Sequence, residues 1–310
     1  MNKIEFRKIK EELRNSQKII ILSTDNDERF EQAKEILKIQ LPNIEYIKID
    51  QKYIDDFDQS EKKSLFATYI ELRQGKESLS QLETNFNNPN YFANLLVFAN
   101  KADGIVSGST HKTSDILRPA FQIIKPRIAS QVISSFMWLC KEEHRDLFMA
   151  DISIMPNPDA SQLAQIAIAT ANSVKTLFNI EPFVAMLSFS TLGSGGKNES
   201  VLKVAKATEI VRDYGINVVG EIQWDAAYFE DVFITKTKTK PQQLPNIFIF
   251  PDLNSGNIGY KIAASLGKFK AIGPLLQNIN KPINDLSRGA TSQEIADLVV
   301  ITALQVIRTR

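Results

Sequence analysis

The side chains with the clearest chemical potential stand in the segment Lys-Pro-Ile-Asn-Asp-Leu-Ser-Arg-Gly-Ala at 281–290 of this 310-residue chain. It places the Ser287 hydroxyl beside the Arg288 guanidinium on a turn, directly before a helical pattern that begins at Thr291. The start of a helix exposes unpaired backbone N–H groups and the positive end of the helix dipole, so anions are stabilised there. A permanent cation and a hydroxyl at this place could bind phosphate or stabilise a developing carbonyl oxyanion. Glu294 would lie in the first turn of the helix and could act as a base, with a simple capped helix as the alternative interpretation.

Other catalytic patterns are missing or incomplete in the sequence. The loop Gly193–Lys197 lacks the flanking residues of a Walker loop or a dinucleotide fingerprint, so it is either a flexible turn or a loop whose N–H groups bind an anion. The two histidines, His111 and His144, are far apart and form no metal-binding motif. Cys140 is the only cysteine, which excludes an intramolecular disulfide and a thiolate metal cluster, and its apolar surroundings predict a buried side chain. We therefore expect no metal site.

The composition is that of a globular protein with room for two domains. Apolar residues make up 43% of the chain and charged residues 24%, and a domain typically holds about 150 residues. The 37 basic and 36 acidic residues nearly balance, which argues against nucleic acid or a membrane surface as a partner because both require a large cationic surface. The N-terminal segment lacks the apolar core of a signal peptide, and no apolar run approaches the roughly 20 residues of a membrane span. These features predict a soluble cytoplasmic protein.

Short β-branched runs alternate with longer amphipathic segments along most of the chain. Strands are expected at 18–23, 44–49, 104–106, 148–155, 183–188 and 246–250, and helices at 28–40, 61–74, 91–99 and 159–178, with a last helix that ends at Ile307. Such alternation predicts α/β layers built on mostly parallel sheets. Ligands in these folds bind beyond the carboxyl ends of the strands, where the Gly- and Asp-rich turns of this chain cluster.

Four longer motifs follow one another along the chain. They are 102–125, which contains Asp-Gly-Ile-Val-Ser-Gly-Ser-Thr-His; 157–168, which begins Asn-Pro-Asp-Ala-Ser; 182–191, which contains Val-Ala-Met-Leu-Ser-Phe-Ser; and 248–288, which runs from Phe-Ile-Phe-Pro-Asp to the Ser287–Arg288 turn. In this order they resemble the phosphate acetyltransferase (phosphotransacetylase) family. The likeness is close through the middle and C-terminal parts of the chain and holds only in pattern in the N-terminal part. Four motifs in register are specific, whereas any one of them would be a weak signal.

The resemblance implies an α/β fold like that of isocitrate and isopropylmalate dehydrogenases, in which two α/β domains flank an active-site cleft. The first domain would comprise residues 1–138 plus 291–310 and the second residues 139–290, and members are commonly homodimers. The implied reaction is the reversible transfer of an acetyl group between coenzyme A and inorganic phosphate, with acetyl phosphate as the phosphorylated partner. Coenzyme A is a substrate in this reaction, and no separate cofactor is implied.

The resemblance assigns catalytic roles to three residues of the C-terminal segment. Arg288 would stabilise negative charge on the acyl and phosphate oxygens, and Ser287 would orient the thiol or the oxyanion. Glu294 would take the thiol proton, because a free thiol is mostly protonated near neutral pH. The family usually carries Asp at this position. Asp285 is therefore the alternative base, and helix capping is the alternative role of Glu294.

Arg73 and Arg118 match arginines that are tied to coenzyme A or phosphate binding in the family. Further candidate substrate-binding residues of this chain are Ser107, Ser109, Thr110, His111, Asn257 and Asp285. The two arginines would bind phosphates of coenzyme A, with surface ion pairs as the alternative. The polar turn 107–111 would donate hydrogen bonds to the phosphoryl group, or it would only close the preceding strand. The Asx-rich turn that contains Asn257 could likewise form without any ligand.

Three other functions stay open at this point. A phosphate butyryltransferase would differ mainly in the size of its acyl pocket, which the sequence does not reveal. A non-catalytic acetyl-CoA-sensing domain of the same fold would have no need of the Ser287–Arg288 pair that this chain retains. A decarboxylating dehydrogenase would require clustered aspartates for a divalent metal, and the sequence contains no convincing cluster of that kind.

Overall fold

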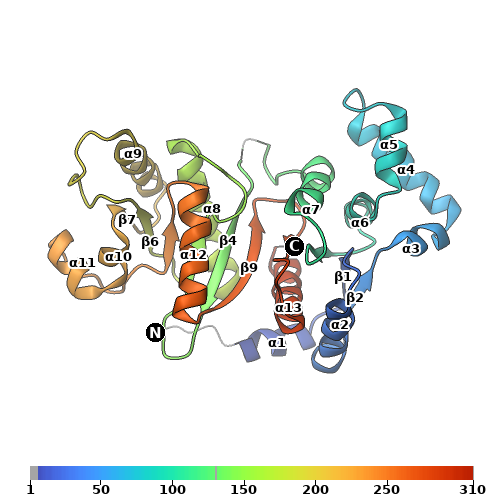
Figure 1. Cartoon of the computed structure of the whole chain (residues 1–310), viewed down its shortest axis with the longest axis horizontal. Coiled ribbons are helices and arrows are strands. Elements are labelled where there is room, and N and C mark those ends of the chain that lie inside the picture. The colour runs from blue at the N-terminus through green and yellow to red at the C-terminus, as the bar shows by residue number, and fades with distance from the viewer. Residues whose placement is uncertain (1–5, 130, 310) are drawn as a thin grey trace. The chain divides into compact units, whose positions relative to one another are not determined.

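The computed structural model describes residues 6–129 and 131–309 of the chain (Figure 1). Its internal contacts divide the chain into two compact units. Unit 1 spans Ser130–Asn278, and unit 2 joins Glu5–Ala129 with Ile279–Arg310. These boundaries differ from the ones expected at 138/139 and 290/291. The reason is that strand β4 (Ser134–Cys140) lies wholly in the sheet of unit 1, whereas strand β10 (Ile283–Asp285) pairs with a strand of unit 2.

Unit 2 is built on a fully parallel four-stranded sheet with the order β10–β3–β1–β2. Its strands are β1 (Ile19–Ser23), β2 (Ile44–Lys48), β3 (Gly104–Ser107) and β10. They bury most of their side chains, as expected for a parallel sheet that is covered on both faces. Because all four strands run the same way, their carboxyl ends meet at one edge of the sheet.

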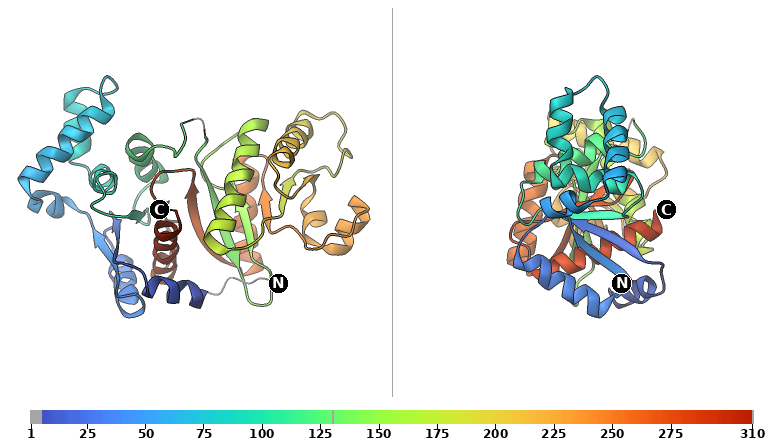
Figure 2. Two further views of the ribbon diagram at one scale, coloured as in Figure 1. Left: turned by 180° about the vertical axis from the view of Figure 1, so that it is seen from behind. Right: turned by 90° about the vertical axis from the view of Figure 1, so that its right-hand side faces the viewer.

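Helices cover both faces of this sheet. α2 (Glu28–Gln40) and α13 (Ser292–Arg308) lie on one face, and α4 (Gln59–Arg73), α5 (Leu79–Phe86) and α6 (Pro89–Phe98) on the other (Figure 1, Figure 2). The remaining helical segments are α1 (Phe6–Arg14), α3 (Gln51–Asp56), α7 (Thr113–Pro119) and a short π-helix (Ala120–Ile124). α13 packs against β1, β3 and α2 and is buried from Ile295 to Val306. The turn before it is therefore held between the end of β10 and a firmly packed helix.

Side-chain caps determine where the helices of unit 2 begin. Five helices begin at a residue whose side-chain oxygen accepts a backbone N–H of the first turn. These residues are Asp27 for α2, Asp50 for α3, Asp58 for α4, Ser78 for α5 and Asn88 for α6. α13 begins with a reciprocal capping box between Thr291 and Glu294. The polar residues that precede each apolar helix pattern thus account for the observed helix starts.

Unit 1 contains a six-stranded mixed sheet with the order β7–β6–β8–β5–β4–β9. The strands are β4, β5 (Leu147–Ala150), β6 (Val184–Leu187), β7 (Val218–Ile222), β8 (Ile247–Ile249) and β9 (Lys270–Gln277). β4 pairs antiparallel with β5 and β9, and the other pairs are parallel. The helices are α8 (Ala160–Phe178), α9 (Glu199–Asp213), α10 (Trp224–Tyr228), α11 (Glu230–Thr237) and α12 (Leu253–Gly267). α8 and α12 lie on opposite faces of the sheet (Figure 1, Figure 2).

The predicted fold class is confirmed, because both units are α/β and most strand pairs are parallel. Three local expectations are wrong: the end of one strand, the burial of Cys140, and the Asx-rich turn around Asn257, which is part of helix α12. β5 ends at Ala150 and not at 155, since the Asp151 carboxylate accepts the N–H groups of Ser153 and Met155 and turns the chain there. Cys140, expected to be buried, is partly exposed at the end of β4. No helix within the described residues combines the length and the apolar character needed to cross a bilayer.

Candidate active site

Most of the residues predicted for the site lie together at the carboxyl edge of the unit 2 sheet. Ser107 ends β3 and Asp285 ends β10, and the two residues are paired in register on neighbouring strands. The turn 108–111 follows the first of these strands, and the turn 287–290 follows the second. The sheet therefore brings distant parts of the sequence to the edge at which α/β folds bind ligands.

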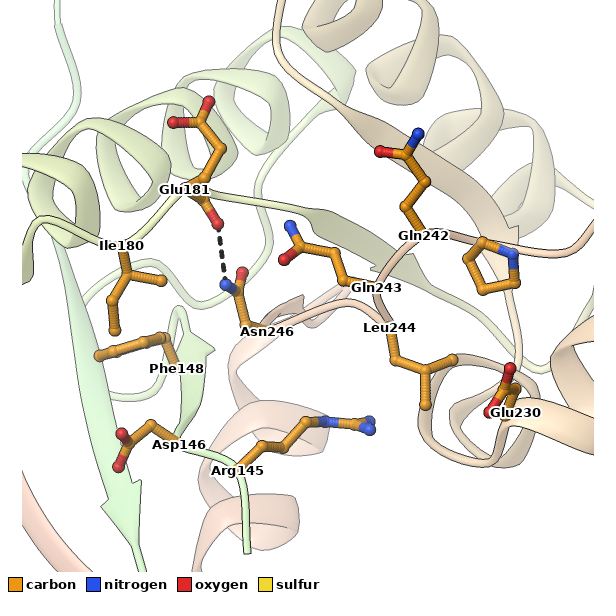
Figure 3. A pocket seen from close by; sticks show the side chains of 11 residues that line it. Arg145, Asp146, Phe148, Ile180, Glu181, Glu230, Gln242, Gln243, Leu244 and Asn246 are labelled. Carbon is orange, nitrogen blue, oxygen red and sulfur yellow. Dashed lines mark hydrogen bonds between the residues drawn. The ribbon is translucent and has the colours of Figure 1, made fainter. Parts of the chain in front are cut away.

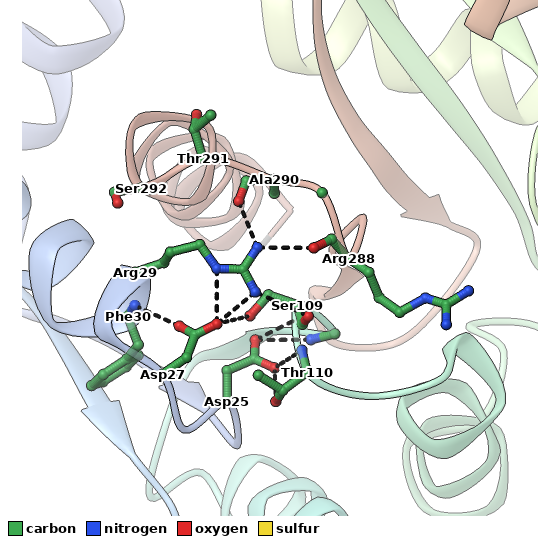
Figure 4. Close-up of polar contacts among 12 residues, drawn as sticks. Asp25, Asp27, Arg29, Phe30, Ser109, Thr110, Arg288, Ala290, Thr291 and Ser292 are labelled. Atoms are coloured by element: carbon green, nitrogen blue, oxygen red, sulfur yellow. Dashed lines mark hydrogen bonds and ion pairs between the residues drawn. The ribbon is translucent and has the colours of Figure 1, made fainter.

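A carboxylate of unit 2 engages the backbone donors of the turn 108–111. Asp25, two residues after β1, accepts hydrogen bonds from three successive N–H groups, those of residues 108, 109 and 110, at 2.9, 3.2 and 2.9 Å (Figure 4). It also accepts the Thr110 hydroxyl at 2.8 Å. Converging N–H groups of this kind form an anion site, and here the anion is an internal side chain. The turn thus closes the strand against Asp25, and donation to a phosphoryl group stays a prediction.

Ser107 and His111 both contact Thr24. The buried Ser107 Oγ accepts a hydrogen bond from Thr24 N at 2.9 Å and lies 2.7 Å from Thr24 Oγ1. His111 Nε2 lies 3.0 Å from the Thr24 carbonyl oxygen, which can only accept, so Nε2 carries the proton in this contact. Both side chains hold the ends of β1 and β3 together, which is the structural role that the sequence left open.

Asp285 is a buried carboxyl group with an incomplete set of partners. The residue is 4% exposed, and its Oδ2 accepts the Thr113 hydroxyl at 2.7 Å. Its Oδ1 has no hydrogen-bond partner within the described chain. Burial, reinforced by the negative charge of Asp25, raises the pKa of Asp285 to about 6. This carboxyl group therefore changes charge close to neutral pH.

Gly108 allows the close approach of the two turns. Its φ is +132°, and an added Cβ would lie 2.8 Å from Leu286 N and against Asp285 Oδ1. A residue with a side chain would be strained at this φ and would push into the end of β10. The position therefore requires glycine.

The turn 287–290 presents the predicted catalytic pair. Ser287 and Arg288 are exposed, and the turn is closed by a hydrogen bond from Ala290 N to Ser287 O at 2.9 Å. The Arg288 guanidinium makes no hydrogen bond or ion pair with any described residue. Figure 4 shows it pointing away from the cluster of Arg29 and Asp27. Its N–H donors are available to a ligand.

Glu294 takes the capping role that was its alternative assignment. Its Oε2 accepts Thr291 N at 2.8 Å and Thr291 Oγ1 at 3.0 Å, while Glu294 N donates back to Thr291 Oγ1 at 3.3 Å. The cap occupies one carboxylate oxygen of a partly exposed side chain. A role as base is compatible with this geometry and stays a prediction.

The two predicted coenzyme A arginines differ in their surroundings. Arg73, at the end of α4, is 9% exposed and pairs with Glu77, with its Nη2 at 2.5 Å and its Nε at 3.0 Å from Glu77 Oε1. Arg118, on α7, is exposed and makes no hydrogen bond or ion pair within the described residues. Burial raises the pKa of the Tyr91 phenol, and both arginines oppose this shift through their charge. Both cations therefore lie within electrostatic reach of the Tyr91 ring.

The remaining predicted features belong to unit 1. Asn257 lies on α12, and its Nδ2 donates to the Ile152 carbonyl at 3.0 Å. In the loop Gly193–Lys197, Gly193 N donates to Glu221 Oε1 at 2.5 Å. An internal carboxylate thus takes the donor that an anion would need, and the contacts favour a structural turn.

Sequence reasoning missed three polar residues of unit 2: Asp25, Asp27 and Arg29. They follow β1 in the run Ser-Thr-Asp-Asn-Asp at 23–27 and in the first turn of α2. Arg29 pairs with Asp27 and reaches backbone carbonyls of the turns 108–111 and 287–290 (Figure 4). Acidic residues directly after a buried strand were the available signal, because ligand-site residues of α/β folds stand there.

A pocket of about 430 Å³ lies in unit 1, away from every predicted site residue of that unit (Figure 3). It is lined by Arg145, Phe148, Asn246 and their neighbours, at the amino ends of β5 and β8. The Arg145 guanidinium carbon lies 4.5 Å from the centroid of the Tyr228 ring, and Arg145 Nη2 donates to the Tyr228 carbonyl oxygen at 3.0 Å. The amino ends are the opposite edge from the one where ligands bind in α/β folds, so this pocket is not the candidate site. Among the described residues, no group of three or more His, Cys, Asp and Glu side chains could hold a metal.

Comparisons with known proteins identify the family and the fold of the chain. The family described as phosphate acetyl/butaryl transferase matches residues 6–303. A phosphate acetyltransferase of Bacillus subtilis (strain 168) is 42% identical over 248 residues, which cover 78% of this chain and 75% of that relative. A crystal structure of a phosphotransacetylase from Streptococcus pyogenes has a TM-score of 0.86 and 37% identity, with 98% of this chain and 99% of that chain covered. A branched-chain phosphotransacylase from Enterococcus faecalis V583 shares the fold, with a TM-score of 0.72. It is 16% identical, and the match covers 94% of this chain and 99% of that chain.

The protein is thus an α/β enzyme of the acyltransferase class, with its candidate catalytic turn at the carboxyl edge of a parallel sheet. The chain belongs to the phosphate acetyl/butaryl transferase family.

Proposed function

We propose that this protein is a phosphate acetyltransferase, which transfers an acetyl group reversibly between coenzyme A and inorganic phosphate. The observation that carries the proposal is the turn 287–290. It presents the unpaired guanidinium of Arg288 next to the Ser287 hydroxyl, at the carboxyl edge of the unit 2 sheet. Membership of the family and relatives named phosphate acetyltransferase support the same conclusion.

The chemistry requires a stabilised oxyanion and a proton acceptor. In the direction of acetyl-CoA formation, the thiol of coenzyme A loses its proton and the sulfur attacks the carbonyl carbon of acetyl phosphate. A carbon–sulfur bond forms, the bond to the bridging phosphate oxygen breaks, and phosphate leaves with the electron pair. Negative charge gathers on the carbonyl oxygen in the transition state, so the Arg288 guanidinium lowers the barrier if it is placed there. Two substrates bound side by side react directly, without an acyl-enzyme.

Two carboxyl groups are candidates for the base. Glu294 is partly exposed, stands at the family position of the base and has its Oε1 outside the cap. Asp285 has the raised pKa that suits a base, but Thr113 and Gly108 cover it and only 4% of the residue is exposed. A general base must come within hydrogen-bond reach of the thiol. We therefore keep Glu294 as the proposed base and Asp285 as its alternative.

Coenzyme A is a polyanion, and Arg118 is the better placed of the two predicted arginines to bind one of its phosphates. Its guanidinium is exposed and unpaired among the described residues, so it can form a bidentate contact without losing a partner. Arg73 is less accessible, because it is buried and its Nε and Nη2 are engaged by Glu77. For the phosphoryl group of acetyl phosphate we propose the turn that contains Ser107, Ser109, Thr110 and His111, whose backbone N–H groups become available when Asp25 releases them. Asn257 lies in unit 1, and its role as a substrate-binding residue stays a prediction.

An assay of acetyl phosphate with coenzyme A, followed through the absorbance of the thioester, tests the proposal directly. Butyryl phosphate in parallel distinguishes an acetyl from a butyryl transferase, since one pocket must accept two further methylene groups to use the longer substrate. Turnover of acetyl phosphate in preference to butyryl phosphate supports the proposal. Binding of acetyl-CoA without turnover of either substrate would identify a non-catalytic sensing domain and refute it.

We further propose that the protein is a homodimer and that α12 lies in the interface. Ile258, Ile262 and Leu266 are 57%, 52% and 81% exposed. Their spacing of four residues places them on one face of the helix, and exposed apolar stripes of this kind are typical of surfaces that bind a second chain. Light scattering on the wild type and on Ile262→Glu tests this. A dimer that dissociates in the variant supports the assignment, and a monomeric wild type contradicts it.

We also propose that the protein acts in the cytoplasm. Its thiol substrate must stay reduced to attack a carbonyl, and reducing compartments keep thiols in that state. Localisation of the tagged full-length protein by cell fractionation tests this proposal.

A further inference from the structure

The guanidinium of Arg29 connects the catalytic turn to the rest of unit 2. Its Nη1 donates to the carbonyl oxygens of Arg288 and Ala290, both at 2.9 Å. Its Nη2 donates to the carbonyl oxygen of Ser109 at 3.2 Å (Figure 4). Arg29, at the start of α2, thus joins the turn 287–290 to the turn 108–111. The first turn lies about 260 residues from Arg29 in the sequence, and the second lies 80 residues from it.

Asp27 fixes the orientation of this guanidinium. Its Oδ2 accepts Arg29 Nε at 2.8 Å and Arg29 Nη2 at 2.5 Å, while its Oδ1 accepts Phe30 N at 3.1 Å as the cap of α2. The carboxylate is therefore held by the helix at one oxygen and holds Arg29 with the other. Charge-assisted, two-point contacts of this kind fix direction as well as distance.

The five N–H donors of Arg29 are all engaged by protein acceptors. Arg29 therefore differs from Arg288, whose donors are unpaired within the described chain. A cation whose donors are all engaged acts on its acceptors, and two of those acceptors are the backbone carbonyls on either side of Gly289. The remaining bonds of the turn are internal, from Ala290 N to Ser287 O and from Gly289 N to Ser287 Oγ at 3.4 Å.

We propose that Arg29 is a positioning residue that holds the turn 287–290 so that Ser287 and Arg288 face the substrates. The assignment rests on the proposed function of that turn. Misplacement of a catalytic group by about 1 Å can reduce the rate on the order of 100-fold. Loss of Arg29 should therefore lower kcat while leaving the affinity for substrates largely unchanged, because Arg29 itself contacts neither of them.

Arg29→Lys is the sharpest test, because lysine keeps the charge and loses the planar fork. One ammonium cannot bridge three carbonyls and a carboxylate. We expect kcat to fall about tenfold in Arg29→Lys and on the order of 100-fold in Arg29→Ala, with KM for coenzyme A and acetyl phosphate within about threefold of wild type. Added guanidinium ion should restore part of the activity of Arg29→Ala. Arg7→Lys is the matched control, since the Arg7 side chain is 80% exposed and its ion pair with Glu11 lies at the surface.

Amide hydrogen exchange of the peptide 286–292 gives a second readout that does not depend on activity. The exchange should accelerate in Arg29→Lys relative to wild type, with the melting temperature of the full chain serving to exclude global unfolding. Unchanged exchange, or a wild-type kcat in Arg29→Lys, would overturn the proposal. A loss confined to KM for acetyl phosphate would also overturn it, because Arg29 would then be a substrate ligand. A wild type without turnover refutes the proposed function, and the exchange measurement then still decides whether Arg29 holds the turn.

Discussion

The buried Asp285 carboxyl group should make the protein lose stability as the pH rises through the slightly acidic range. Its pKa is about 6 in the folded protein against an ordinary value of 3.8. Between these two values the folded state holds a proton that the unfolded state has released. Stability therefore falls with rising pH by about 1.4 kcal/mol per pH unit in that window. The stabilising protonated form is present at low pH and is lost as the pH passes 6.

Asp285→Asn isolates this effect because asparagine is never charged and can still accept the Thr113 hydroxyl. From pH 4.5 to pH 7.5 the titration of Asp285 removes about 2 kcal/mol of stability from the wild type, worked from the two pKa values. The variant lacks this loss. The free-energy difference between variant and wild type should therefore shift by about 2 kcal/mol in favour of the variant over that interval. Constant costs of the substitution cancel in this comparison.

Urea unfolding of the full-length protein at the two pH values measures the shift. Asp213→Asn serves as the control, because Asp213 is an exposed aspartate at the end of α9. Equal pH dependence in the wild type and Asp285→Asn would refute the reasoning. It would mean that the carboxyl group is charged in the folded protein at both pH values.

Three further predictions address the site. Gly108→Ala should reduce the stability of the protein by more than about 1 kcal/mol and also reduce its activity, because an added Cβ would lie against Asp285 and Leu286 at a φ of +132°. Thermal unfolding and the thioester assay measure the two effects. A variant that behaves like the wild type would contradict the close approach. Glu294→Gln should keep the cap of α13, since glutamine fits the same capping box, yet lower kcat by about 100-fold or more if Glu294 is the base. An unchanged kcat in this variant would transfer the role to another group, with Asp285 the next to test. Arg118→Ala should raise KM for coenzyme A about tenfold, with little effect on KM for acetyl phosphate. Arg73→Ala should in addition lower the stability of the protein, because it leaves the buried Glu77 carboxylate without its cation. Equal KM effects on both substrates would contradict the assignment of Arg118.

Apolar runs of the chain predicted β1, β2, β3, β5, β6 and β8, whereas β4, β7, β9 and β10 were not predicted. Those at 18–23, 44–49, 104–106 and 183–188 all contain strands, and Asp159 caps α8 as expected. β10 was missed because its three residues include two buried polar side chains, Asn284 and Asp285, and therefore show no apolar run. Its place in unit 2 follows from pairing with β3, a long-range contact that local patterns do not contain.

The site was predictable where its chemistry is local and unpredictable where it depends on partners distant in sequence. Ser287 and Arg288 stand next to each other in the sequence, so the sequence alone was sufficient to predict a turn that carries both side chains. The role of Asp25 as the carboxylate that accepts the N–H groups of the turn 108–111 was not predicted, because these donors become its neighbours only through the parallel pairing of β1 and β3. Arg29 was missed for the same reason. Whether Glu294 caps a helix or accepts a proton also depends on how the bound substrates lie, which sequence spacing does not specify.

The central claim is that the Arg288 guanidinium stabilises the negative charge of the transition state. The most direct measurement is kcat for acetyl phosphate and coenzyme A in Arg288→Ala, with Arg7→Ala as the exposed control. Removal of one oxyanion donor typically lowers kcat about 100- to 1,000-fold, and we predict a loss in this range with the fold intact. A kcat for Arg288→Ala equal to that of the wild type would contradict the account.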